Sequence, residues 1–185
     1  MWSVICGLMV LRGADVCGQT PASKEYQVKA VFLFNFAQFV DWPPAAFEGA
    51  NTPLVIGVLG ENPFGAYLDE TVRDEKVSTH PLQVQRYRRV DDIHTCHVLF
   101  ISRSEASGLE HILAGLKDRS IVVVGDADDF VQRGGMIGLA TVQNRIRLII
   151  NIEAAKAANL TISSKLLRSA EVVRPSSWSS RRPPL

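Results

Sequence analysis

The chain has 185 residues, of which 46% are hydrophobic and 21% charged, and its formal net charge is +1. This length suits one domain that buries a core without disulfides or metals, and the composition is typical of a globular protein rather than a disordered one. Because the net charge is near zero, nothing in the composition indicates a nucleic-acid partner or binding to an anionic membrane.

Residues 1–23 are expected to be an export signal that is cleaved in the periplasm. The apolar run from Trp2 to Leu11 has the length of a secretory hydrophobic region and about half the length that a membrane span requires. No lysine or arginine precedes it, which leaves a disordered cytoplasmic leader as the alternative. Cleavage would remove two of the three cysteines, so Cys96 would be alone and no internal disulfide is expected.

The segment 24–41 has the apolar spacing of a helix and is followed by Pro43 and Pro44, which cannot continue one. A first apolar stripe is expected to face the core and comprises Tyr26, Ala30, Leu33, Phe34, Ala37 and Val40. A second stripe comprises Val28, Phe32, Phe36 and Phe39. The polar residues between them exclude a membrane span.

Two stripes make this helix apolar over a wider arc than the roughly 100° that contact with one core requires. The second stripe and Trp42 either pack beneath other elements or form a surface for a partner. Aromatic side chains are enriched at protein interfaces. We therefore take Phe32, Phe36, Phe39 and Trp42 as candidate contacts with another protein or with a second copy in a homodimer.

Strands alternate with helices over the rest of the chain. Strands are expected at 54–60, 81–87, 96–102, 120–126, 136–142 and 145–151. Helices are expected at 63–73, at 105–118 with Ser104 as the cap, and from near Asn151 and Ser163. Gln143 and Asn144 suit a two-residue hairpin turn.

This order of elements predicts one α/β domain over residues 24–173, followed by a disordered tail at 174–185. The domain is expected to be a three-layer sandwich with a mostly parallel sheet of about six strands and a C-terminal antiparallel hairpin.

Polar residues at the carboxyl ends of the predicted strands are candidates for a ligand site, because open α/β sheets bind ligands there. They are Glu61, Asn62, Arg86, Arg88, Arg89 and Asp126. Simpler roles remain open for all of them: an ordinary turn after the first strand, arginines neutralised by neighbouring acids, and an acid that stabilises a helix N-terminus.

The sequence lacks the motifs of common catalytic and metal-binding sites. His94, Cys96 and His97 lie close together, but on a strand His97 points away from the other two, and no second ligand cluster completes a zinc site. No serine lies in a nucleophile elbow, and the loop 60–65 lacks the lysine of a phosphate-binding loop. A protein without enzymatic activity, metal or cofactor is therefore expected.

Five segments together resemble the YfiR family of bacterial periplasmic proteins, over about residues 24–173. They read KAVFLFNFAQFVDWP, IGVLGENPFG, CHVLFIS, IVVVGDADDFVQRGGMIGL and RIRLIINIEAAKAANLTISSKLLRSA. The resemblance implies an exported regulator that binds the periplasmic part of an inner-membrane signalling protein. Where the partner is a diguanylate cyclase, the resemblance implies that this binding restrains cyclic-di-GMP synthesis and that release of the cyclase favours biofilm formation. The alternative is a small-ligand sensor module that works with a histidine kinase or another membrane receptor.

The chain departs from this family at one position. The resemblance implies cysteines in many members at the positions of Gly57 and Cys96, on neighbouring strands. Gly57 leaves Cys96 without that partner. We therefore do not expect redox control through such a bridge, and expect Cys96 to be a small buried residue.

Overall fold

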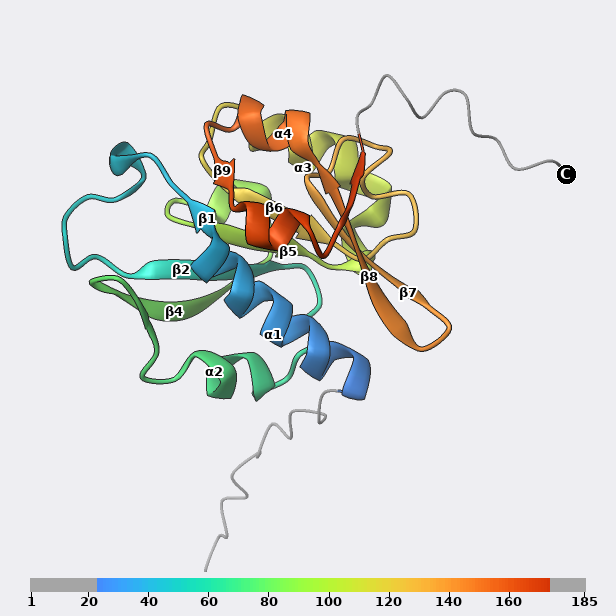
Figure 1. Ribbon diagram of the computed structural model, residues 1–185, viewed down its shortest axis with the longest axis horizontal. Coiled ribbons are helices and arrows are strands. Elements are labelled where there is room, and N and C mark those ends of the chain that lie inside the picture. The colour runs from blue at the N-terminus through green and yellow to red at the C-terminus, as the bar shows by residue number, and fades with distance from the viewer. Residues whose placement is uncertain (1–22, 174–185) are drawn as a thin grey trace, which may run out of the picture.

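The computed structural model describes residues 23–173, which are built around an eight-stranded sheet (Figure 1). The strand order is β10-β8-β7-β6-β5-β2-β4-β3. The strands are β2 (Leu54–Leu59), β3 (Lys76–Val77), β4 (His80–Tyr87), β5 (Val98–Ile101), β6 (Val122–Gly125), β7 (Ile137–Val142), β8 (Arg145–Asn151) and β10 (Glu171–Val173). The predicted leader, apart from Ser23, and the predicted tail lie outside the described residues.

The centre of the sheet is parallel, as predicted. β4, β2, β5, β6 and β7 run in one direction, and β8 and β3 are each antiparallel to a neighbour. Every residue of β2, β5 and β6 is buried, which explains why these strands read as unbroken apolar runs. The sheet has eight strands rather than about six, because β3 and β10 are edge strands of two and three residues.

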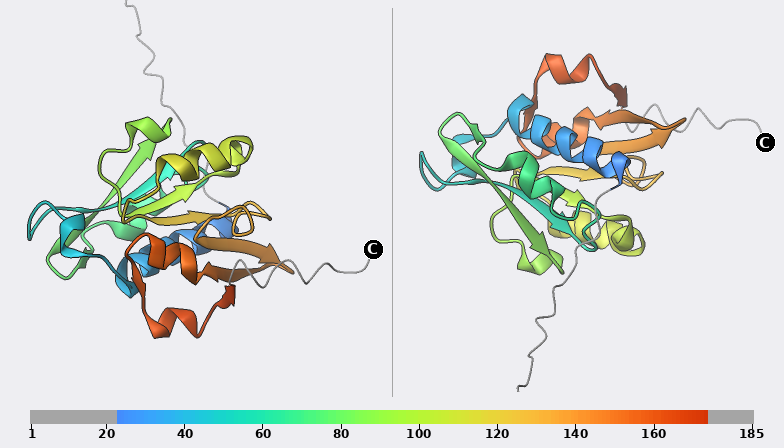
Figure 2. Two further views of the ribbon diagram at one scale, coloured as in Figure 1. Left: turned by 90° about the horizontal axis from the view of Figure 1, so that it is seen from above. Right: turned by 90° about the horizontal axis from the view of Figure 1, so that it is seen from below.

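Helices cover both faces of the sheet, which confirms the three-layer α/β prediction (Figure 2). Helices α1 (Lys24–Phe39) and α2 (Tyr67–Val72) pack on one face, and α3 (Leu109–Gly115) lies on the other. A 3-10 turn, η3 (Arg103–Gly108), leads into α3, and it is capped by Ser102 rather than by Ser104.

The strands β7 and β8 are joined through Gln143 and Asn144, and Val142 pairs with Arg145 across the turn. Both turn residues have positive φ, 49° and 60°. Two consecutive left-handed residues match the right-handed twist of the flanking strands.

Helix α1 ends two residues earlier than expected, because Val40 and Asp41 form the short strand β1. This strand pairs antiparallel with β9 (Thr161–Ile162), and the Ser163 amide donates to the Phe39 carbonyl. The predicted helix 63–73 is also shorter, since Asn62 Oδ1 accepts from the Phe64 amide and holds a turn before α2 begins.

The remaining short elements connect the layers. They are the 3-10 turns η1 (Pro44–Ala46) and η2 (Val90–Asp92) and the helices α4 (Ile152–Ala157) and α5 (Ser164–Leu167). Asn151 caps α4 by accepting a hydrogen bond from the Ala154 amide. None of the helices between residues 23 and 173 has the length and apolar character needed to cross a membrane.

Candidate functional site

The aromatic residues of α1 and Trp42 are not equivalent in the structure. Phe36 has no exposed surface and belongs to the core, so its assignment to a partner surface is corrected: it cannot contact a partner while the helix is packed. Phe32, Phe39 and Trp42 are half-buried. The most exposed apolar side chains of the helix are Val28 and Val31, at 48% and 42%.

The half-buried aromatic residues have neighbours within the protein. Lys165 of α5 places its Nζ 4.8 Å from the centre of the Phe39 ring. The Trp42 ring packs edge-on against His97, with centroids 6.1 Å apart. Val28 and Val31, by contrast, lie on the solvent side of the helix, between positions that face the sheet. The exposed apolar part of α1 is therefore formed by the two valines with Phe32 at their margin.

A buried ionic cluster joins α1 to the carboxyl end of β6. Lys29 Nζ lies 2.6 Å from Asp126 Oδ2 and 2.5 Å from Glu25 Oε1, and the side chains of Lys29 and Asp126 are both fully buried. The Tyr26 hydroxyl also donates to Asp126, at 2.9 Å. Arg103 donates to the Asp126 backbone carbonyl.

These contacts account for the pKa changes in the cluster. Its hydrogen bond to Lys29 lowers the pKa of Glu25, whereas burial and the neighbouring Asp126 raise the pKa of Tyr26. Asp126 is closed to solvent and already paired, so its prediction as a ligand-binding residue is corrected: it holds α1 on the sheet.

The other predicted ligand residues support local structure or point to solvent. Asn62 shapes its own turn, and Arg86 forms a two-fold contact with Asp69 of α2. Arg89 pairs with Asp91, as the neutralisation hypothesis anticipates. Arg88 and Glu61 are exposed. The structure thus assigns most of this set to turns and surface ion pairs.

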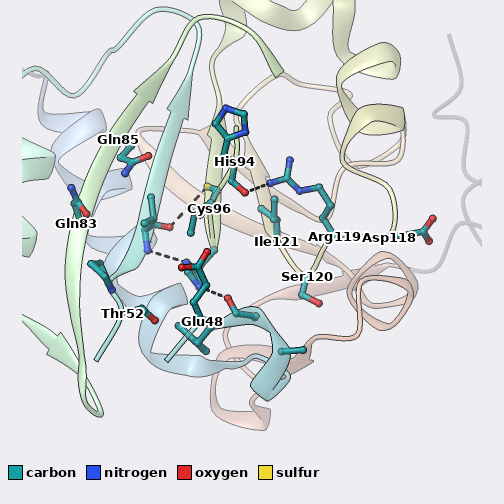
Figure 3. A pocket seen from close by; sticks show the side chains of 17 residues that line it. Glu48, Thr52, Gln83, Gln85, His94, Cys96, Asp118, Arg119, Ser120 and Ile121 are labelled. Carbon is teal, nitrogen blue, oxygen red and sulfur yellow. Dashed lines mark hydrogen bonds between the residues drawn. The ribbon is translucent and has the colours of Figure 1, made fainter. Parts of the chain in front are cut away.

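A pocket of about 620 Å³ lies at the amino-terminal ends of the parallel strands, opposite the carboxyl ends where a ligand site was predicted (Figure 3). We call it the amino-edge pocket. Its walls come from the loop between β1 and β2, from β4, and from the segments just before β5 and β6. Polar side chains in the lining include Glu48, Thr52, Gln83, Gln85, His94, Asp118, Arg119 and Ser120. The pocket was not predicted from the sequence, since its residues come from four separate segments with no shared motif.

The buried groups beside the pocket have pKa values that favour their uncharged forms. Burial raises the pKa of the Cys96 thiol to about 12, so it stays protonated at neutral pH and is a poor nucleophile. The Tyr87 hydroxyl lies 2.7 Å from the Thr95 carbonyl, and burial raises its pKa as well. Burial also lowers the pKa of His97, which favours the neutral ring. In residues 23–173 no group of three or more potential metal ligands comes together.

A model of the family described as YfiR/HmsC-like matches residues 26–171. The chain belongs to the YfiR/HmsC-like family. This family is known for periplasmic regulators in cyclic-di-GMP signalling and is a regulatory rather than an enzymatic family. Its match spans all but the first two residues of α1 and the whole sheet up to the start of β10, so the family assignment and the fold concern the same part of the chain.

Among solved structures, the chain is similar to a conserved domain protein from Vibrio cholerae O1 biovar El Tor strain N16961. The two share 17% sequence identity with a TM-score of 0.44, over 64% of this chain and 54% of that one. The match therefore spans about half the length of the Vibrio protein. No curated protein matches the sequence.

Proposed function

We propose that this protein is a periplasmic regulator without enzymatic activity that binds and restrains an inner-membrane signalling protein. The partner we propose is a diguanylate cyclase, so that binding keeps cyclic-di-GMP synthesis and biofilm formation low. The observation that carries this proposal is the family match over residues 26–171.

The exposed side of α1 supports a role in binding. Val28 and Val31 are 48% and 42% exposed on consecutive turns, and Phe32 lies half-buried beside them. Exposed apolar side chains that lie together are typical of interaction sites. The helix beneath them is fixed by the Lys29–Asp126 pair, so the surface is presented on a rigid element.

The test is to replace Val28 and Val31 together with Ser and to measure cyclic-di-GMP in cells that carry the membrane cyclase. Loss of restraint should raise cyclic-di-GMP to the level of a strain lacking the regulator, while the circular dichroism spectrum and melting temperature stay unchanged. Val172→Ser is the matched control, because Val172 is similarly exposed, at 45%, but lies on β10. Full restraint by the double variant would contradict the role of this surface.

Restraint itself is tested without any variant. If removing the gene leaves cyclic-di-GMP unchanged and the purified protein does not bind the periplasmic part of the cyclase, the proposed partner class is wrong. A membrane signalling protein encoded beside this gene would be the first partner to test.

A second candidate function is a small-ligand sensor module that acts on a histidine kinase or another membrane receptor. The pocket of about 620 Å³ at the amino edge of the sheet favours it, since ligand sites commonly have volumes of about 300–1,000 Å³. Ser120 lines this pocket and is only partly exposed, so Ser120→Trp should fill it. A sensor would then lose its response to a signal but keep its binding to the receptor.

A further inference from the structure

The loop that forms one wall of the amino-edge pocket is held by a three-ring stack. This loop, residues 43–53, joins β1 to β2 and contributes Phe47. The Phe47 ring stacks on His80 at a centroid distance of 3.9 Å and on His97 at 4.5 Å, with interplanar angles of 15° and 19°. One aromatic ring of the loop is thus enclosed between two histidines of the sheet.

Hydrogen bonds fix the protonation of His97. A backbone amide can only donate, so His97 Nδ1 accepts from the Val55 amide at 3.0 Å. The proton of the neutral ring therefore lies on Nε2, which is 3.1 Å from the Ala46 carbonyl and donates to it. The ring uses both nitrogens, one toward β2 and one toward the loop, and it does so only while neutral.

Two further side chains hold the same loop. His80 Nδ1 lies 2.7 Å from the Thr52 carbonyl, and the Thr79 hydroxyl donates to the Ala50 carbonyl. Most of the loop is otherwise exposed, and its main apolar contact is Phe47. Detaching the loop would thus break a small set of contacts, of which His97 supplies two.

The surroundings of His97 are unfavourable for a positive charge. The residue is 2% exposed, and Trp42 and Phe47 cover the ring. His80 faces it across Phe47, and a charge on His80 would repel one on His97. The adjacent Cys96 is an uncharged thiol. The charged groups that line the neighbouring pocket are Glu48, Asp118 and Arg119, with His94 beside them. The hydrogen bonds of the two ring nitrogens go to the Val55 amide and the Ala46 carbonyl rather than to any of these groups.

We propose that residues 43–53 form a flap that closes on the amino-edge pocket while His97 is neutral and opens when His97 takes up a proton. A proton from solvent would bind Nδ1, place a second N–H against the Val55 amide, and replace an attractive contact with a repulsive one. The charged imidazole is then more stable in water than in the stack. When it leaves the stack, residues 43–53 lose its contacts and the flap opens.

The direction of the pH effect follows from the lowered pKa of His97 in the closed form. The open form binds the proton more tightly, so acid favours it. The closed form is fully stable above the ordinary histidine pKa of about 6.5. Below that value the ratio of closed to open flap falls by up to roughly tenfold per pH unit, until the pKa of the closed form is reached.

The experiment is hydrogen exchange of the full chain, read by mass spectrometry at pH 7.5, 6.5 and 5.5 and corrected for the intrinsic exchange rate. Peptides covering 43–55 should open up to roughly fivefold more on going from pH 6.5 to 5.5, because the open form is already half protonated at pH 6.5. Peptides from β5 and β6 should keep their protection. Equal loss in β5 and β6, or no change in 43–55, would overturn the proposal.

The variant His97→Asn tests whether protonation of His97 causes the opening. The Asn oxygen can still accept from the Val55 amide, but the residue cannot become charged, so exchange of 43–55 should become independent of pH. His111→Asn is the matched control, because His111 is exposed on α3, outside the stack. A pH response that persists in His97→Asn would assign the effect to another group.

A second measurement covers the case in which His97→Asn does not fold. In the unmodified protein, nuclear magnetic resonance can follow the His97 ring nitrogens and the Val55 amide during a pH titration. The proposal requires both to change with the same midpoint, below about 6.5. Separate midpoints would contradict it.

Discussion

Lys29 and Asp126 form an ion pair of 2.6 Å between side chains that solvent does not reach, although 97 positions separate them in the chain. The pair fastens the first helix to the end of β6. Taking two charges out of water is costly, so the pair depends on its geometry and on the further hydrogen bonds from Tyr26 and to Glu25.

Removing one member of this pair should destabilise the protein more than removing both. We expect Lys29→Met to lower the free energy of unfolding by about 3 kcal/mol, because Asp126 stays buried without its cation. Lys29→Met combined with Asp126→Leu should recover most of that loss. Urea denaturation measures the unmodified protein and both variants, and a double variant no more stable than Lys29→Met would show that the charges stabilise the fold by themselves.

Gly57 and Cys96 are placed for a disulfide that the chain lacks. A Cβ atom on Gly57 would lie 2.8 Å from Cys96 Sγ, close to the roughly 3 Å between these atoms in a disulfide. Gly57→Cys should therefore form the bridge once the Tyr87 ring, 2.7 Å from the new Cβ, moves aside. In a chain also carrying Cys6→Ser and Cys17→Ser, we expect oxidation to remove both thiols and to stabilise the fold by about 2–4 kcal/mol.

Gly57→Ser is the matched control for this bridge, since serine has a similar size and cannot form it. Its stability should not respond to reductant. Two free thiols in oxidised Gly57→Cys, measured by thiol titration, would show that the two strands cannot adopt disulfide geometry.

Phe36 and Phe32 are four positions apart on α1 but should differ in their effect on stability. Phe36 is fully buried, so Phe36→Ala leaves a cavity and should cost about 3–5 kcal/mol. Phe32 is half-buried, and Phe32→Ala should cost about 1 kcal/mol. Guanidinium denaturation distinguishes them, and similar losses would mean that Phe32 is also part of the core in solution.

The hairpin turn offers a stabilising substitution. Gln143 has φ of 49°, a conformation that costs most side chains energy but not glycine. We expect Gln143→Gly to raise the free energy of unfolding by about 0.5–1 kcal/mol and Gln143→Val to lower it, because a β-branched residue fits this conformation poorly. Thermal denaturation measures both changes, and an effect of the same sign in both would contradict the turn geometry.

The sequence allowed the main layers to be predicted because their signals are local. Unbroken apolar runs identified β2, β5 and β6, and Gln143 with Asn144 identified the turn between β7 and β8. The strands β1, β3, β9 and β10 were missed because two or three residues carry no periodicity. Their pairing depends on partners far along the chain.

The same distinction explains the errors at the candidate site. Lys29 counted only as one of the polar residues that exclude a membrane span, because nothing near it in the sequence shows that it pairs with Asp126. Phe36 was placed in the wrong stripe, since spacing alone does not fix which arc of a doubly apolar helix faces the sheet. His97 was expected on a strand but lies just before β5, and its stack with Phe47 and His80 brings together three segments.

The pairing of β1 with β9 has a consequence for how the chain folds. Val40 meets Ile162, and Lys29 meets Asp126, so the first helix completes its packing only after most of the polypeptide has been synthesised. Until then the part of the helix that these two segments contact stays uncovered. Contacts between such distant segments slow folding. An unfinished chain would therefore expose apolar side chains of this helix, which favours aggregation. A holdase chaperone that shields apolar segments should raise the yield of folded protein.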